Sequence, residues 1–332
     1  MNRLRMQESE KHSLPVLAVD LGGTKVIIAI IATDGQLIAE ERYPTLAGEG
    51  PQAVIDQLLS NMNHLLTLNN MEPSQLGGIS IAAAGAIDSA RGMITFSPNL
   101  PEWTDIPLRD MVQEKYRVGT FLVNDASAAA LGEYQFGVGR GINNLILLTL
   151  GTGIGGGIVI NGELYTGSSG SAGEIGHMTI DVNGPRCACG NKGCLEALAS
   201  GTAVAREAIR RVKQGEKSSL VGIAGGQVED ITAKTVGVAA KQEDPLSLAI
   251  ISETGTYLGI GMTNLVNIFN PDMIVAGGGM AKLGDLLLDP ARQVVEERAF
   301  PVSAQAVQIL AAQLGNKAGV YGAAAFALRQ KS

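Results

Sequence analysis

The pattern of apolar and polar residues marks two similar segments in the chain. Residues 16–31 (VLAVDLGGTKVIIAII) and 145–162 (LILLTLGTGIGGGIVING) each place a glycine turn between two apolar, β-branched runs, which predicts a strand, a tight turn and a second strand. The second segment also fits the G-x-G-x-x-G dinucleotide fingerprint. That fingerprint requires a helix after the glycines, whereas residues 158–160 (IVI) continue as strand. Two such hairpins predict a duplicated α/β architecture with a cleft between its halves, where backbone amides of both turns could hold a phosphate chain.

The rest of the pattern alternates between helical and strand periods. Apolar stripes at helical spacing predict a helix beginning at Pro51 and further helices at 201–214, 232–242, 245–269, 283–299 and 318–329. Apolar runs predict strands at 77–84, 118–123, 272–276 and 307–312. Within 245–269, Gly255, Gly259 and Gly261 leave room for a close neighbour or a flat ligand ring. No linker divides the chain, so the lobe boundary has to be inferred from the repeat.

A polar pair, Asn124–Asp125, lies where a predicted strand ends and a helix begins. The carboxyl ends of strands are where open α/β sheets bind ligands, which favours a functional role for Asp125. Aspartate is also a common helix N-cap, and residue type alone does not separate these two interpretations.

Potential metal ligands gather between Glu174 and Glu196. All three cysteines, Cys187, Cys189 and Cys194, lie here, and His177 precedes them. Three thiols and an imidazole form the ligand set of a closed structural zinc site, and the neighbouring glycines supply tight turns. The odd number of cysteines and the C-x-C spacing argue against a disulfide framework. A reactive or simply packed group of thiols is the alternative.

Composition narrows the class of protein. A length of 332 residues suits two domains, and no apolar run approaches the ~20 residues that span a bilayer. The first thirteen residues are polar and mixed in charge, which predicts neither a signal peptide nor a helix-turn-helix module. A formal net charge of −7 disfavours a nucleic-acid partner. Cysteines confined to one metal-like group fit a reducing cytoplasm.

Five motifs together resemble the sugar kinases of the ROK family (repressors, uncharacterised frames and kinases), and its bacterial glucokinases most of all. They are DLGGTK at 20–25, NDASAAALGE at 124–133, GTGIGGG at 151–157, E-x-G-H at 174–177 and CACGNKGCLE at 187–196. The resemblance covers 16–329. It implies an actin-like, hexokinase-type (ribonuclease H-like) ATPase fold of two duplicated α/β lobes around a cleft. We expect a small lobe at 15–123 plus 316–332, a large lobe with a zinc-binding loop at 124–315, and a disordered extension at 1–14.

The same resemblance implies ATP-dependent phosphorylation of the 6-hydroxyl of a hexose, most of all glucose. Asp125 matches the general base. The positions that match hexose-binding residues are Gly85, Asn99, Asn124, Glu174, His177 and Glu196. The positions that match ATP-binding residues are Asp20, Gly22, Gly23, Thr24, Lys25, Gly151, Thr152, Gly153, Gly277, Gly278 and Gly279, with Asp20 orienting Mg²⁺ through water. One structural Zn²⁺ per chain would be bound by His177, Cys187, Cys189 and Cys194. Ser127 departs from the asparagine of many relatives.

Several alternatives share these motifs. Kinases for N-acetylmannosamine, mannose, fructose or allose are rivals within the enzyme class, and polyphosphate is a rival donor to ATP. A sugar-sensing repressor is a different class, but it needs a DNA-binding module, and only a short polar segment precedes Val16. An inactive sugar-binding scaffold is disfavoured by the intact Asp125 and both phosphate loops. The family resemblance also predicts a homo-oligomer, either a dimer or a tetramer.

Overall fold

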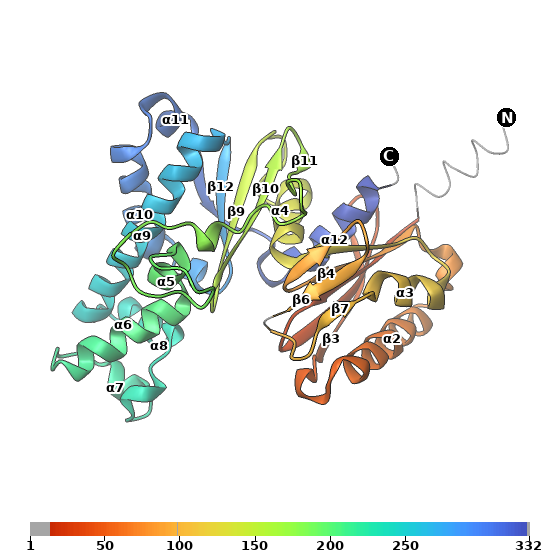
Figure 1. The fold of residues 1–332 in the computed structure, drawn as a ribbon, viewed down its shortest axis with the longest axis horizontal. Helices are drawn as coiled ribbons and strands as arrows, with labels where there is room; N and C mark the ends of the chain where they lie inside the picture. The colour runs from red at the N-terminus through yellow and green to blue at the C-terminus, as the bar shows by residue number, and fades with distance from the viewer. Residues whose placement is uncertain (1–13, 98, 331–332) are drawn as a thin grey trace.

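The computed structural model describes residues 14–97 and 99–330 (Figure 1). The extension expected at 1–14 lies outside the described residues, apart from Leu14. The first lobe contains β1 (Val16–Leu21), β2 (Lys25–Ile31), β3 (Leu37–Pro44), α2 (Pro51–Leu68), β4 (Gly78–Ala83), β5 (Ala86–Asp88), β6 (Met93–Phe96), β7 (Thr104–Ile106), α3 (Leu108–Tyr116) and β8 (Thr120–Asn124). Short 3₁₀ helices, η1 (Ala47–Glu49) and η2 (Pro73–Gln75), lie in its loops.

The second lobe is larger and richer in helix (Figure 1). Its strands are β9 (Leu145–Leu150), β10 (Ile154–Ile160), β11 (Glu163–Leu164), β12 (Met273–Gly277) and β13 (Gln308–Ala311). Its helices are α4 (Asp125–Phe136), α5 (Leu195–Ala199), α6 (Gly201–Lys213), α7 (Leu220–Ile223), α8 (Ala233–Lys241), α9 (Pro245–Phe269), α10 (Asp285–Arg298) and α11 (Pro301–Ala306), with η3 (Ile175–His177), η4 (Val228–Asp230) and η5 (Met280–Leu283) between them. The chain ends with η6 (Gly315–Lys317) and α12 (Ala318–Arg329), which returns to the first lobe.

The two five-stranded sheets have the same plan, as the sequence predicts. Their orders are β3-β2-β1-β4-β8 and β11-β10-β9-β12-β13. In each sheet the hairpin pairs antiparallel, and the strand beside its first arm, β4 or β12, pairs parallel. Both glycine turns therefore connect the first two strands of equivalent sheets. The second turn is followed by strand β10, so the structure confirms that the G-x-G-x-x-G spacing here is a hairpin.

Helices α4 and α12 lie between the two sheets (Figure 1). α12 packs on β1 and β4, α4 packs on β9 and β10, and the two helices pack on each other. The contact is close because it is lined by small residues. A Cβ on Gly322 would collide with the Ala128 carbonyl, and a Cβ on Gly132 would collide with the Ala318 carbonyl. We propose the lobe boundaries expected from the sequence, because each of the two helices packs mainly on the sheet of its own lobe.

One feature differs from the sequence expectation, and a second settles an alternative that the sequence left open. A three-stranded sheet, β5-β6-β7, occupies residues 86–106, where the pattern predicted no strand. Gly255 and Gly259 pack against α10 and Gly261 packs against Leu195, so the space beside these glycines holds protein and no ligand ring. Among residues 14–97 and 99–330, no helix is both long and apolar enough to cross a membrane.

Candidate active site

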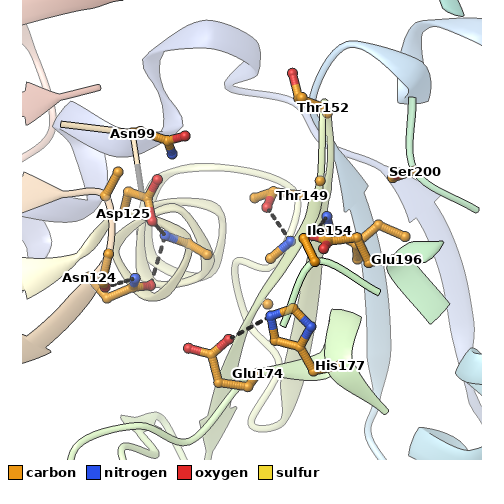
Figure 2. Close-up of a pocket in the computed structure, with 18 of the residues that line it drawn as sticks. Asn99, Asn124, Asp125, Thr149, Thr152, Ile154, Glu174, His177, Glu196 and Ser200 are labelled. Carbon is orange, nitrogen blue, oxygen red and sulfur yellow. Dashed lines mark hydrogen bonds and ion pairs between the residues drawn. The ribbon is translucent and has the colours of Figure 1, made fainter. Parts of the chain in front are cut away.

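Asp125 is the first residue of α4 and follows β8 directly, at the edge of a cleft of about 970 Å³. The N-cap is Asn124. Its Oδ1 accepts hydrogen bonds from the backbone N–H groups of Ala126 and Ser127, at 3.0 Å each. The Asn124 side-chain amide donates to the Gly85 carbonyl at 3.1 Å, which ties the helix start to the first lobe. Asp125 therefore does not serve as the N-cap, and its carboxyl group lines the cleft (Figure 2).

Burial raises the pKa of the Asp125 carboxyl group above its ordinary value, and the nearby Glu174 carboxylate adds to this shift. The Ala126 N–H, which donates to Asp125 Oδ1 at 2.8 Å, acts in the opposite direction. Asp20, at the end of β1, has a pKa raised to about 7 by burial and by the charge of Asp125, against an opposing effect of Lys25. The carboxyl group of Asp125 is therefore near enough to that of Asp20 to raise its pKa.

Glu196 lies on α5, across the cleft from Asp125 (Figure 2). Its Oε2 accepts a hydrogen bond of 2.9 Å from the backbone N–H of Ile154, directly after the second glycine turn. A Cβ on Gly153 would overlap this carboxylate, so glycine is required for the approach. The contact fixes Glu196 against the turn that the sequence assigns to phosphate binding.

Glu174 directly precedes the short helix η3 and His177 is its last residue; both line the cleft, at the bottom of the view in Figure 2. The Glu174 carboxylate is 63% exposed and lies 3.9 Å from His177 Nε2. His177 Nδ1 points the other way and is 3.7 Å from Cys187 Sγ. One ring nitrogen therefore faces the cleft and the other faces the cysteines.

The four predicted metal ligands come together in space. The ligand atoms of His177, Cys187, Cys189 and Cys194 all lie within 4.8 Å of one another. A tetrahedral zinc site with Zn–S bonds of about 2.3 Å separates its sulfurs by about 3.8 Å. Cys189 Sγ and Cys194 Sγ are 3.8 Å apart, as such a site requires. The donor set and its spacing fit a structural zinc ion, with three sulfurs and one nitrogen completing the tetrahedron.

Both glycine turns are fixed by neighbouring elements. In the first, the Gly22 N–H donates to the Lys25 carbonyl at 3.1 Å, and Thr45 Oγ1 donates to the Gly22 carbonyl at 2.6 Å. In the second, the Gly151 carbonyl accepts from the Gly201 N–H at 2.8 Å, and the Thr152 carbonyl accepts from Thr202 Oγ1 at 2.8 Å. The start of α6 therefore holds the second turn in place.

Most of the predicted site residues line this one cleft. They are Gly23, Thr24, Gly85, Asn99, Asn124, Asp125, Gly151, Thr152, Gly153, Glu174, His177, Cys187, Glu196 and Gly278. Seven others do not line it, namely Asp20, Gly22, Lys25, Cys189, Cys194, Gly277 and Gly279. Gly278, with φ +87°, lies over the Leu150 carbonyl, which brings the β12 turn beside the second glycine turn.

The cleft also contains residues that the sequence analysis did not single out. They include Phe96, Thr149, Ser171, Arg186, Ser200, Thr202 and Arg206. Ser200 had a local signal, since it is the N-cap of α6 and its side chain accepts from the Ala203 N–H at 3.2 Å. No such signal pointed to Arg206, because an arginine in an amphipathic helix normally extends into solvent.

Comparisons with known proteins agree with this geometry. The ROK family model matches residues 16–330. The chain is 37% identical to a glucokinase of Thermotoga maritima, over 94% of this chain and 96% of the relative. It is 34% identical to a xylose repressor of Caldicellulosiruptor bescii, over 94% of this chain and 78% of the repressor.

A solved ROK family glucokinase of Streptomyces griseus, in complex with glucose and AMPPNP, superposes with a TM-score of 0.82 at 35% identity. The superposition covers 95% of this chain and 99% of the other. The expected two-lobed, actin-like fold is thereby confirmed. The family match over nearly the whole chain, together with this structural agreement, shows that the chain belongs to the ROK family.

Proposed function

We propose that this protein transfers the γ-phosphoryl group of ATP to the 6-hydroxyl of a hexose, and that glucose is the preferred hexose. The observation that carries the proposal is the placement of Asp125. Its carboxyl group enters the cleft where polar side chains that could grip a sugar, such as Asn99 and Glu174, meet the two glycine turns. Relatives named glucokinase, similar over almost their full length, support glucose as the acceptor.

In this proposal Asp125 accepts the proton of the sugar hydroxyl. The hydroxyl oxygen then forms a bond to the γ-phosphorus, the bond to the β-phosphate oxygen breaks, and ADP leaves with that electron pair. A general base of this kind contributes typically ~10²–10⁴-fold to the rate. The raised pKa of Asp125 suits the task, because a more basic carboxylate accepts a proton more readily. Asn124 keeps Asp125 at the helix start.

The remaining residues hold the two substrates. Asn99, Asn124, Glu174, His177 and Glu196 would bind the sugar hydroxyls, with the Gly85 backbone beside them, because carboxylates and amides make charge-assisted or paired hydrogen bonds to hydroxyl groups. Backbone N–H groups of the two glycine turns and of the β12 turn would bind the phosphate chain. Mg²⁺ bound with ATP neutralises charge on the phosphoryl oxygens. Asp20 would orient that ion through water.

We propose one structural zinc ion per chain. His177, Cys187, Cys189 and Cys194 would bind it, and because four protein ligands complete the tetrahedron, its contribution is to brace the loop. The brace would orient His177 Nε2 toward the sugar and hold α5, which carries Glu196. Thiolate ligands need a reducing compartment, so we also propose a cytoplasmic location. A dimer or tetramer, and the lack of a nucleic-acid partner, stay predictions of the sequence.

The repressor alternative has support from relatives, since a xylose repressor matches almost as well as the glucokinase. Both classes keep a sugar-binding cleft. They differ in turnover, because a sensor needs to bind sugar without transferring a phosphoryl group. Retention of Asp125 beside two formed glycine turns favours the kinase.

The deciding experiment offers the purified protein a panel of hexoses with ATP and Mg²⁺ and measures ADP release by a coupled assay. Glucose, mannose, fructose, allose and N-acetylmannosamine form the panel, and sugar phosphate formed from polyphosphate tests the donor. We expect the highest kcat/KM with glucose and ATP. Activity highest with another hexose would replace glucose as the substrate. Sugar binding without turnover on any member would overturn the kinase proposal in favour of the sensor.

A further inference from the structure

We propose that Arg206 binds the phosphate chain of the nucleotide donor, an inference that rests on the kinase function proposed above. Arg206 lies on α6 and lines the same cleft as Thr24, Thr152 and Gly278. The sequence did not predict that Arg206 would line this cleft. The guanidinium group would add a fixed positive charge to a site whose proposed phosphate-binding groups are mostly backbone amides.

The first argument concerns direction. Side chains of an α-helix tilt toward its N-terminus, and Arg206 lies one turn after Thr202 on α6. Thr202 is the residue whose N–H and Oγ1 both bond the Thr152 carbonyl, at 3.3 and 2.8 Å. The Arg206 side chain thus extends from the face of α6 that contacts the second glycine turn, back toward that turn.

The second argument concerns the anchor of the guanidinium group. One of its terminal nitrogens donates a hydrogen bond to the Ala197 carbonyl on α5. Ala197 follows Glu196, whose carboxylate bonds the N–H after the glycine turn at 2.9 Å. This bond anchors one end of the guanidinium, and among the described residues no other hydrogen bond from Arg206 is found. A planar guanidinium with free donors is suited to bidentate contacts with phosphate oxygens.

The third argument concerns charge. Asp125, Glu174 and Glu196 make the cleft acidic, yet a nucleotide donor brings several negative charges of its own. Among the described residues, no ion pair includes Arg206, whereas Arg210 and Arg211 on the same helix are both paired with Glu207. Of these three arginines on α6, only the unpaired Arg206 lines the cleft, which Arg186 of the preceding loop also lines. Charge complementarity therefore favours an anionic ligand at Arg206.

A purely structural role is the rival explanation. If Arg206 only holds α5 through Ala197, its loss would loosen Glu196 and weaken sugar binding, with nucleotide affinity unchanged. Phosphate binding predicts the reverse. The single tryptophan, Trp103, is buried in the first lobe four residues beyond Asn99, so its fluorescence can report sugar binding separately.

The test measures binding of AMPPNP with Mg²⁺ by calorimetry, in the presence of glucose, for the wild-type chain and for Arg206→Gln. We expect Arg206→Gln to raise the Kd at least about tenfold, equivalent to about 1.4 kcal/mol, as for loss of a charge-assisted hydrogen bond. Glucose affinity should change less than about threefold. The matched control is Arg210→Gln on the same helix, which removes the same charge and should leave the nucleotide Kd within about twofold.

Salt dependence and a second variant complete the test. Nucleotide affinity of the wild type should fall more steeply with ionic strength than that of Arg206→Gln, because one contact between charges is lost. Arg206→Lys keeps the charge without the planar fork and should recover part of the affinity. An unchanged nucleotide Kd in both Arg206 variants would overturn the inference alone. A wild-type chain that binds no nucleotide would overturn the proposed function, and the inference with it.

Discussion

At the scale of single residues, two adjacent polar side chains divide two tasks: one caps the helix α4, and the other lines the cleft. Asn124 caps α4, which leaves the Asp125 carboxylate free for the cleft. Asp20 is buried beside α12, where Gly319 leaves room for its carboxyl group. Burial and the neighbouring charge raise the pKa of both acids, so the ionised pair destabilises the fold.

We predict that Asp20→Asn stabilises the protein at pH 8. The folded-state pKa of Asp20, about 7, exceeds the ordinary value of 3.8, so the folded chain binds more protons between these pH values and stability falls as the pH rises through this window. The substitution removes this loss. Urea unfolding should show a gain on the order of 2 kcal/mol at pH 8, and a smaller gain at pH 5.

The control for this prediction is Asp56→Asn, on the exposed face of α2, which should have little effect at either pH. Activity of Asp20→Asn should fall, because Asp20 would no longer orient Mg²⁺. A gain in stability that does not change between pH 5 and pH 8 would contradict the account of its pKa.

The sequence could identify these residues but could not assign their local roles. Asparagine and aspartate are both good N-caps, so the pair at 124–125 fits either order of roles. Only the backbone path shows which of the two side chains turns back to the helix amides. The sequence did not point to Arg206 for a related reason. Its proposed role depends on its hydrogen bond to α5, and the position of α5 depends in turn on the loop that carries the predicted metal ligands.

At the scale of elements, the junction of β8 and α4 determines where the Asp125 carboxyl group lies. The Asn124 side chain joins that junction to Gly85 of the first lobe while it caps the helix. Loss of this side chain should therefore affect both the stability of α4 and the position of Asp125.

We predict that Asn124→Ala lowers the free energy of unfolding by about 1 kcal/mol, the usual cost of a lost N-cap. It should also lower kcat by about 10–100-fold, because a small displacement of a catalytic group is costly. The matched control is Thr232→Ala, which removes the cap of α8 at a residue that does not line the cleft. It should cost similar stability with kcat unchanged. Equal kcat values in the two variants would contradict the positioning role of Asn124.

The loop that carries the proposed zinc ligands is a second element with a sharp test. Metal analysis of the purified protein should find about one zinc per chain, and Cys189→Ser should lose most of it, because a closed site requires all four ligands. Thermal unfolding of the variant should begin at a lower temperature, and the KM for the sugar should rise as His177 and Glu196 lose their support. A metal-free protein with full activity would show that the cysteines only pack together.

Long periodic elements were predictable and short ones were not. The helix at 245–269 has the bounds that its apolar stripe predicts, and both hairpins form as expected. Strands β5, β6 and β7 are three or four residues long, so they show too few alternations to be recognised. Gly255 and Gly259 of α9 allow α10 to pack closely against it. The sequence of α9 alone does not predict which helix packs there.

At the scale of the whole molecule, duplication explains why the site forms between lobes. Equivalent hairpins of the two sheets direct their glycine turns at one cleft, and α4 and α12 cross between the sheets. The buried carboxylate of Glu133 strengthens this crossing by accepting hydrogen bonds from the N–H groups of Gln313 and Leu314, at 3.1 and 2.7 Å. Sugar and nucleotide would each contact both lobes, so we expect their binding to close the cleft and exclude water from the phosphoryl group.

The sequence predicted this architecture because the repeat and the family motifs are properties of the chain itself. The relative placement of α5, α6 and the second glycine turn depends on packing between segments distant in sequence. For that reason the motifs predicted many residues that the structure gathers in one cleft, whereas the presence of Arg206 in that cleft emerged only from the fold.

The most direct test of the account compares the wild type with Asp125→Ala in glucose-dependent ADP release, and measures glucose binding to both by Trp103 fluorescence. The account predicts that Asp125→Ala still binds glucose but loses turnover by at least ~10²-fold, because the proton of the hydroxyl has no acceptor. A variant that keeps more than about a tenth of the wild-type rate would contradict the assignment of Asp125 as the general base.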